Sequence, residues 1–234
     1  MKKLIPNPPA KAKRDMPALL FDLDGTLTDS VYQHAFAWKD ALEHVGVNIP
    51  LWTIHRQIGM SGGLLARKLL SLSGKRLTVQ LIERVKKFHT KSFKGLEASV
   101  RLLPGAKELL AELSRLGVPW TIATSGSLVD VRSSLKLLGI DKSAPIVTRD
   151  SVEAAKPNPD LFLAAAEKLG VAIEDSIVVG DSIWDLLAAR RAKTFGIGLL
   201  TGGYGREELE HAGAYRVYED PKQMLDNLED IGIS

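Results

Sequence analysis

The stretch LLFDLDGTLTDS, residues 19–30, starts as an apolar run typical of a buried strand and then places two aspartates where that strand must end. Side chains two positions apart on a strand point to the same side, so Asp22 and Asp24 can face a common space. Gly25 lets the chain turn away sharply after them. A buried strand end therefore holds two carboxylates in a fixed mutual geometry, which a pair of catalytic groups requires.

From Leu103 onward, short β-branched runs alternate with helical patterns. This alternation is typical of βαβ units, so we expect an α/β fold with a Rossmann-like core, in which a parallel sheet carries helices on both faces. A first strand at 18–23 belongs to the same sheet. The further strands are expected at 119–125, 144–148, 176–181 and 194–200.

Residues 30 to about 95 contain helical patterns only, for example Val31, Ala35 and Trp38 at helical spacing. Because this block interrupts the sheet after its first strand, we expect an all-helical cap domain at 30–98, inserted into a catalytic core formed by 17–29 and 99–234. Residues 1–16 contain three prolines and five basic residues against one acidic residue, which predicts a disordered basic tail.

The composition argues against several classes of protein. Hydrophobic residues make up 45% of the 234 positions, enough for a buried core, but no apolar run approaches the roughly 18 residues of a membrane span. The net charge of +3 comes from the tail, and the rest of the chain has 26 basic and 27 acidic residues, so nucleic acid is not an expected partner. With no cysteine and no signal-peptide pattern, we expect a cytoplasmic protein.

Parallel sheets bind ligands at the carboxyl ends of their strands, and this sequence places carboxylates, hydroxyls and one lysine there. Four carboxylates that converge on one space repel one another strongly, which implies a bound divalent cation. Mg²⁺ fits best, because the ligands are oxygen atoms and no His or Cys lies nearby in the sequence. The residues concerned are Asp22, Asp24, Thr124, Ser125, Gly126, Lys156, Asp181 and Asp185.

A divalent cation and a lysine together attract a phosphoryl group, and the TSG sequence at 124–126 offers hydroxyls and backbone N–H groups to its oxygens. Lys156 is followed by Pro157, and we expect Asn158 to cap the next helix and Pro159 to occupy its first position, so that a stiff loop displays the lysine. One aspartate can then attack phosphorus in line, while the other protonates the leaving oxygen and activates water.

The motifs DLDGT, a Thr-Ser pair at the end of the next strand, KP and GDSIWD occur in this order, and together they resemble the four motifs of the haloacid dehalogenase superfamily. The resemblance covers about residues 17–220, and the helical insert resembles the first type of cap in that superfamily. It implies Mg²⁺ bound by Asp22, by the backbone carbonyl of Asp24 and by Asp181. The other implied roles are nucleophile for Asp22, general acid/base for Asp24, phosphate binding for Thr124 and Ser125, charge balance for Lys156, and orientation of the metal's surroundings for Asp185.

Some of these core residues also have a structural interpretation. Taken alone, Thr124 and Ser125 fit caps of the next helix, and Lys156 fits a surface lysine. Asp185 follows Asp181 by four residues, which places the two on one helix face, and this spacing fits a second layer around the metal as well as a ligand.

In the cap, His34 lies on an apolar stripe, which fits a core or interface histidine as well as a substrate contact. In the loop GMSGG, we expect Ser61 to cap the following helix, so that the backbone N–H groups at Gly62 and beyond point into the cleft. The alternative is that the glycines only make a flexible corner. Trp52 and Trp120 are expected to pack in the interior.

These observations predict a Mg²⁺-dependent phosphatase that hydrolyses a small phosphorylated metabolite, phosphoglycolate-like or a small sugar phosphate, through an aspartyl-phosphate. The alternatives are a sugar-phosphate mutase of the same family and a catalytically silent binding module. β-Phosphoglucomutase-like proteins carry an arginine in the cap loop for a second phosphate, whereas IGMSGGLL, residues 58–65, has glycines there, which favours hydrolysis. Asp24 argues against a dehalogenase proper, and the intact motifs argue against a silent module. Monomer and homodimer both remain open.

Overall fold

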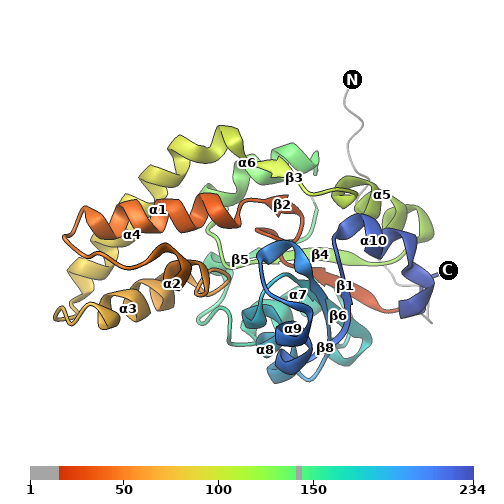
Figure 1. Cartoon of the computed structure of the whole chain (residues 1–234). Helices are drawn as coiled ribbons and strands as arrows, with labels where there is room; N and C mark the ends of the chain where they lie inside the picture. Colours follow the sequence, from red (N-terminus) through yellow and green to blue (C-terminus); the bar gives the residue numbers. More distant parts are fainter. Residues whose placement is uncertain (1–15, 141–143) are drawn as a thin grey trace.

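The computed structural model describes residues 16–140 and 144–234, so the tail expected at 1–16 lies, except for Met16, outside the described residues. Within them, six parallel strands form one sheet in the order β5-β4-β1-β6-β7-β8. This sheet and its flanking helices confirm the expected α/β fold (Figure 1). The strands are β1 (Ala18–Phe21), β4 (Trp120–Thr124), β5 (Ile146–Thr148), β6 (Ser176–Gly180), β7 (Phe195–Leu199) and β8 (Ala214–Tyr218).

β1 lies in the middle of the sheet between β4 and β6, and each of its four residues is buried. A continuous apolar run is what a strand covered on both faces requires. The strand ends at Phe21, two residues earlier than the sequence predicts, and Asp22 follows it directly. The sequence does not predict β8, because apolar and polar residues alternate only in part in AYRVY. The first three residues of this edge strand are partly or fully exposed.

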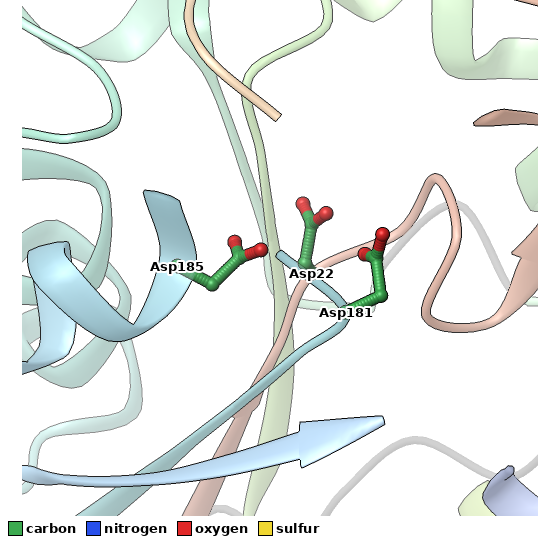
Figure 2. A group of neighbouring side chains, drawn as sticks. All are labelled: Asp22, Asp181 and Asp185. Carbon is green, nitrogen blue, oxygen red and sulfur yellow. The ribbon is translucent and has the colours of Figure 1, made fainter. Parts of the chain in front are cut away.

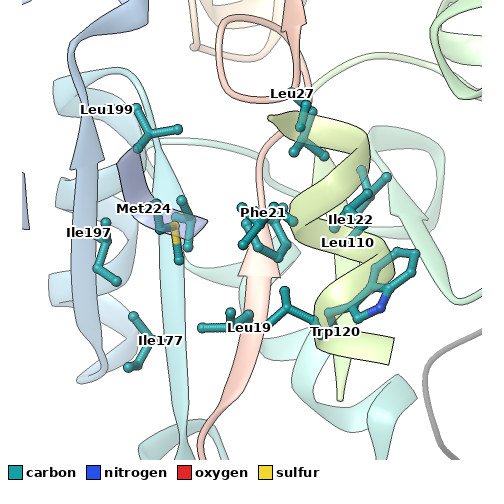
Figure 3. Close-up of a cluster of buried hydrophobic side chains, with 14 of the residues drawn as sticks. Leu19, Phe21, Leu27, Leu110, Trp120, Ile122, Ile177, Ile197, Leu199 and Met224 are labelled. Atoms are coloured by element: carbon teal, nitrogen blue, oxygen red, sulfur yellow. The ribbon is translucent and has the colours of Figure 1, made fainter. Parts of the chain in front are cut away.

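Helices cover both faces of the sheet, as expected. Leu19 and Phe21 of β1 point to the face covered by α5, α6 and α10, where Trp120 is also buried (Figure 3). Leu20 points to the opposite face, which α7 and α8 cover. The core helices are α5 (Ala106–Leu116), α6 (Leu128–Leu138), α7 (Asp160–Leu169), α8 (Ile183–Ala192), α9 (Arg206–Ala212) and α10 (Pro221–Asp226).

The expected helical block forms a second apolar cluster, separate from those of the sheet. Its first helix buries Val31, Ala35 and Trp38, as the spacing predicts. Trp52, however, is 71% exposed, so the expectation that it packs in the interior is wrong: α2 has five residues, and Ile54 is the one that it buries. The helices of this block are α1 (Val31–Glu43), α2 (Leu51–His55), α3 (Gly62–Leu72) and α4 (Val79–Leu96), followed by the short 3₁₀ helix η1 (Glu97–Ser99).

The helical block leaves and rejoins the core through a small antiparallel pair of strands, β2 (Thr28–Asp29) and β3 (Arg101–Leu102). Two-residue strands are too short for periodicity to predict, and their pairing depends on contact between segments more than 70 residues apart. Across residues 16–140 and 144–234, every helix is too short or too polar to cross a membrane.

Candidate active site

Three buried carboxylates meet at the carboxyl ends of the central strands (Figure 2). Asp22 follows β1, Asp181 follows β6, and Asp185 lies in the first turn of α8; one oxygen from each lies within 4.8 Å of the others. Two glycines make room for them: a Cβ atom on Gly25, which has φ +91°, would come within 2.3 Å of Asp181 Oδ2, and one on Gly202 within 2.1 Å. A side chain at either glycine would therefore displace Asp181.

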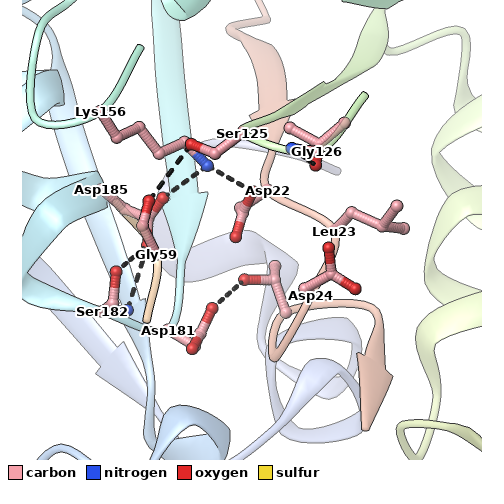
Figure 4. A network of polar contacts seen from close by, with 12 residues as sticks. Asp22, Leu23, Asp24, Gly59, Ser125, Gly126, Lys156, Asp181, Ser182 and Asp185 are labelled. Atoms are coloured by element: carbon pink, nitrogen blue, oxygen red, sulfur yellow. Dashed lines mark hydrogen bonds and ion pairs between the residues drawn. The ribbon is translucent and has the colours of Figure 1, made fainter. Parts of the chain in front are cut away.

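Lys156 provides the positive charge of this cluster (Figure 4). Its side chain is completely buried, and Nζ contacts Asp22 Oδ1 and lies 2.8 Å from Asp185 Oδ1. The interpretation of Lys156 as a surface lysine is therefore wrong. The next helix begins one residue later than expected, because Pro159 is the N-cap of α7 and Asp160 its first residue.

The cluster has three carboxylates for one lysine, and this imbalance affects its ionisation. Burial raises the pKa of Asp22 to about 7, although Lys156 opposes the shift. Burial and the carboxylates of Asp185 and Asp22 also raise the pKa of Asp181 well above its usual range. Burial alone would lower the pKa of Lys156, but Asp185 and Asp22 raise it above its usual range. The site thus holds a permanent cation, while Asp22 and Asp181 ionise only at a higher pH than usual.

Asp185 is oriented by Ser182 at the start of its own helix. Its Oδ2 atom accepts hydrogen bonds from the backbone N–H of Ser182, at 3.1 Å, and from the Ser182 hydroxyl. The expectation that Asp181 and Asp185 share a helix face is wrong, because α8 begins at Ile183 and Asp181 lies before it. The two carboxylates approach each other because the chain turns at Ser182 between β6 and α8.

Asp24 has a different environment from Asp22. Its Oδ1 atom accepts a 2.7 Å hydrogen bond from the Ser30 hydroxyl and lies 3.4 Å from His34 Nε2. Burial alone would raise the pKa of Asp24, but His34 and Ser30 lower it below its usual value. Of the four carboxylates expected to converge, the structure brings three within 4.8 Å, while Asp24 faces the cap.

Thr124 is the last residue of the neighbouring strand β4, and Ser125 follows it. Neither residue caps the next helix, because Ser127 is the N-cap of α6 and its hydroxyl accepts from the N–H of Asp130. Thr124 is buried, and its Oγ1 accepts a 3.0 Å hydrogen bond from the N–H of Gly126. The Ser125 hydroxyl donates to the carbonyl of Gly59 in the cap loop, at 3.2 Å. This turn therefore contacts the cap as well as the catalytic end of the sheet.

A pocket of about 380 Å³ lies between the sheet and the cap. Asp22, Asp24, Thr124 and Ser125 line its core wall. The cap wall includes His34, which lines the pocket and also stacks on Phe93 in the aromatic interior of the cap. Residues that sequence reasoning missed also line the pocket, namely Trp38, Lys86, Lys87, His89 and Arg149.

The loop before α3 contributes to the pocket wall, but Ser61 does not make the side-chain contact that the sequence predicts. Ser61 is the N-cap of α3, yet its side chain makes no capping hydrogen bond; instead its backbone N–H donates to the carbonyl of Lys156 at 3.1 Å. Gly62 lines the pocket, and a Cβ atom placed on it would lie 3.5 Å from the Trp38 ring. The loop is therefore a packed part of the pocket wall.

The arrangement of these motifs matches a known family. Residues 16–193 match the family model described as haloacid dehalogenase-like hydrolase. The chain belongs to this family. A phosphoglycolate phosphatase of Neisseria meningitidis serogroup A is 33% identical over 80% of this chain and 81% of its own length, and a β-phosphoglucomutase of Bacillus subtilis is 29% identical over 80% and 84%. The crystal structure of a hydrolase from Pseudomonas syringae is 49% identical, covers 92% of this chain and 99% of its own, and superposes with a TM-score of 0.90.

The haloacid dehalogenase-like hydrolase has a second contact between cap and core, formed by the residues at and after the end of α2. The carbonyl of Arg56, directly after α2, accepts hydrogen bonds from Trp184 Nε1 at 3.2 Å and from the Tyr204 hydroxyl at 2.9 Å. The guanidinium of Arg56 forms an ion pair with Glu208 and lies 4.1 Å from the centroid of the Tyr204 ring. His55 Nε2 lies 2.9 Å from the carbonyl oxygen of Gly202. Arg56 thus contacts Trp184, Tyr204 and Glu208 of the core.

Proposed function

We propose that this haloacid dehalogenase-like hydrolase is a Mg²⁺-dependent phosphatase that hydrolyses the monophosphate ester of a small metabolite. The observation that carries the proposal is the position of the Asp22 carboxylate. It lines the pocket, is held by Lys156, and is next to Asp181. A carboxylate in that position can act as a nucleophile toward a phosphoryl group.

The divergent environments of the two aspartates support a division of labour. Asp22 would attack phosphorus and form an aspartyl-phosphate, because its carboxylate is fixed by Lys156 at the end of a rigid strand. Asp24 would protonate the leaving oxygen and then take a proton from the attacking water. Its carboxylate faces Ser30 and His34 and is outside the cluster that holds Asp22. Thr124 and Ser125, on the pocket wall, would hold the phosphoryl oxygens.

The cluster fits a magnesium ion. Its donors are carboxylate oxygens only, and burial, together with the neighbouring carboxylates, raises the pKa of both Asp22 and Asp181. Asp22, Asp181 and the backbone carbonyl of Asp24 would hold the ion, and Asp185 would orient Lys156 beside it. When bound, Mg²⁺ offsets the negative charge of the carboxylates and of the phosphoryl oxygens.

The cap wall suits a compact monophosphate. The loop at 58–65 brings glycines and no cationic side chain to the pocket, so this loop offers no arginine to a second phosphate. The cations that line the pocket lie elsewhere, on Lys86 and Lys87 of α4 and on Arg149 of the core. A pocket of about 380 Å³ holds a two- or three-carbon acid phosphate or a small sugar phosphate. These features favour transfer of the phosphoryl group to water over return to a substrate, as a mutase requires.

A screen of phosphomonoesters with Mg²⁺, followed by phosphate release, tests the proposal. We expect a small monophosphate to be the best substrate and Asp22→Asn to abolish turnover, because an amide is a poor nucleophile. Asp175→Asn, at an exposed position, is the matched control and should retain wild-type turnover. Turnover of Asp22→Asn within about tenfold of wild type would contradict the mechanism, since loss of a nucleophile costs far more. Conversion of a sugar 1-phosphate into the 6-phosphate without phosphate release would establish the mutase instead.

A further inference from the structure

His89 contacts His34, the histidine that lies beside the Asp24 carboxylate. It lies on α4, and its Nε2 atom is 3.2 Å from Nδ1 of His34 on α1. The other ring nitrogen of His34, Nε2, is 3.4 Å from Asp24 Oδ1. Two imidazole rings thus connect the carboxylate of Asp24 to the helix on the far side of the cap pocket, and both rings line that pocket.

Aromatic packing fixes both rings in place. The ring of Phe93 stacks on His34 with centroids 3.9 Å apart and planes at 4°. The ring of Trp38 stacks on His89 with centroids 4.2 Å apart and planes at 20°. Each ring can therefore rotate little. The packing of α1 against α4 sets both the contact between His34 and His89 and the contact between His34 and Asp24.

When His34 is neutral, the hydrogen-bonding capacity of each group gives the pair one consistent arrangement. An ionised carboxylate only accepts, so the His34 nitrogen that faces Asp24 must carry a hydrogen. In a neutral His34 ring, Nδ1 is then an acceptor and needs a donor, which Nε2 of His89 supplies. Burial between α1 and α4 lowers the pKa of His89 well below its usual value, so this ring is the neutral partner that the arrangement needs.

We propose that His89 is a positioning residue that acts through His34, by selecting the His34 tautomer whose Nε2–H is directed at the Asp24 carboxylate. The proposal rests on the proposed function, in which Asp24 is the general acid/base. Without His89, the Nδ1 atom of His34 loses its donor, and the ring is free to carry its hydrogen on Nδ1 instead. The contact with Asp24 would then lack a hydrogen, and the carboxylate would lose a partner that holds it toward the leaving oxygen.

Two substitutions at position 89 separate this role from packing. Phenylalanine keeps an aromatic ring against Trp38 but has no hydrogen-bonding atom, whereas glutamine loses the ring and keeps an amide that can donate to Nδ1 of His34. His44→Phe is the matched control, because His44 also lies in the cap against an aromatic ring, that of Phe88, and is not among the residues that line the pocket. Turnover is measured with an alkyl phosphate, whose leaving group needs protonation, and with an activated aryl phosphate, which does not.

We expect His89→Phe to lower kcat for the alkyl phosphate by about 10- to 100-fold and for the aryl phosphate by less than about threefold. His89→Gln should recover most of the alkyl activity, and His44→Phe should match wild type with both substrates. Equal losses on the two substrates, or failure of glutamine to recover more activity than phenylalanine, would overturn the proposal. Asp24→Asn is measured alongside: if it shows no preference for the aryl phosphate, the proposed role of Asp24 fails, whatever the His89 variants do.

A measurement on the unmodified protein tests the same inference without turnover. Long-range ¹H–¹⁵N NMR spectra of the histidine rings should show His34 protonated on Nε2, with a coupling across the hydrogen bond between His34 Nδ1 and His89 Nε2. His89→Phe should shift the His34 nitrogens toward a mixture of tautomers, and His44→Phe should leave them unchanged. A wild-type spectrum with His34 protonated on Nδ1 alone, or on both ring nitrogens, would overturn the proposal.

Discussion

Lys156 Nζ lies 2.8 Å from Asp185 Oδ1, and both side chains are completely buried. Removal of one partner from a buried ion pair leaves an unpaired charge, which costs more than the pair itself contributes. The same lysine also contacts Asp22, so it serves two carboxylates at once. The stability and the activity of this protein therefore depend on the same side chain.

We expect Lys156→Met to lower the free energy of unfolding by about 3–5 kcal/mol in the presence of a chelator, measured by urea denaturation. Lys94→Met, at an exposed position on α4, should change it by less than about 0.5 kcal/mol. Adding Asp185→Asn to Lys156→Met should restore part of the loss, because the double variant has one fewer unpaired charge. A loss no larger than that of the Lys94 control would show that the buried pair does not contribute.

The metal-free protein should lose stability as the pH rises from about 5 to 8. Burial raises the pKa of Asp22 to about 7 in the folded protein, and the pKa of Asp181 is also raised. A group whose pKa is higher in the folded than in the unfolded chain stabilises the fold at low pH, and this contribution is lost as the pH rises through the folded pKa. The lowered pKa of Asp24 has the opposite effect, but at pH values below this window. The lowered pKa of His89 also opposes the loss below about pH 6.5, where the two carboxylates outweigh the one histidine.

Urea denaturation at several pH values, with a chelator and with saturating Mg²⁺, measures this effect. Mg²⁺ should abolish the loss, because it binds the ionised carboxylates and not the protonated ones, so that its own affinity rises over the same pH range. Stability in the chelator that is flat between these pH values would contradict the shifted pKa values.

Gly62→Val should raise KM for the natural substrate several-fold and leave a small generic aryl phosphate almost unaffected. A Cβ atom at this position would already lie 3.5 Å from the Trp38 ring, so the two methyl groups of valine crowd the pocket wall. Gly63→Val is the matched control, since a Cβ atom there meets nothing within 4 Å. Steady-state kinetics that show equal effects of the two variants would mean that Gly62 does not shape the substrate site.

Arg56→Ala should loosen the contact of the cap with the core without disturbing the sheet. It removes the Glu208 ion pair and the contact with the Tyr204 ring but keeps the backbone carbonyl that Trp184 and Tyr204 bind. Because exposed ion pairs and cation–π contacts each contribute up to about 1 kcal/mol, we expect faster amide hydrogen exchange in residues 51–61 by roughly three- to tenfold. Arg67→Ala, an exposed arginine on α3, should leave the exchange unchanged.

The catalytic end of the sheet was predictable because its information is local. Asp22, Lys156 and Asp181 each follow a strand or precede a helix whose apolar pattern is clear in the sequence, and parallel strands bring their ends together. The same reasoning could not place Lys156 between Asp22 and Asp185, because the direction of a long side chain depends on the packing of the whole site.

Contacts between the helices of the cap could not be predicted from the sequence in this way. His89 shares the inward face of α4 with Val85 and Phe93 at intervals of four residues, and that spacing is the one signal that points to it. Its contact with His34 depends on how α1 packs against α4, which the pattern of neither helix determines. Trp52 illustrates the opposite error, because an apolar side chain on a five-residue helix need not be buried.

The pairing of β2 with β3 makes the cap an exchangeable module. Thr28 pairs with Leu102 and Asp29 with Arg101, so the chain leaves and re-enters the core at neighbouring positions. A two-residue turn between Asp29 and Arg101 would close this pair as an ordinary β-hairpin and leave the sheet continuous. The nucleophile and its lysine would remain, but Ser30 and His34, the partners of Asp24, lie beyond this junction. A transplanted cap would therefore bring a new substrate pocket together with a new setting for the acid/base.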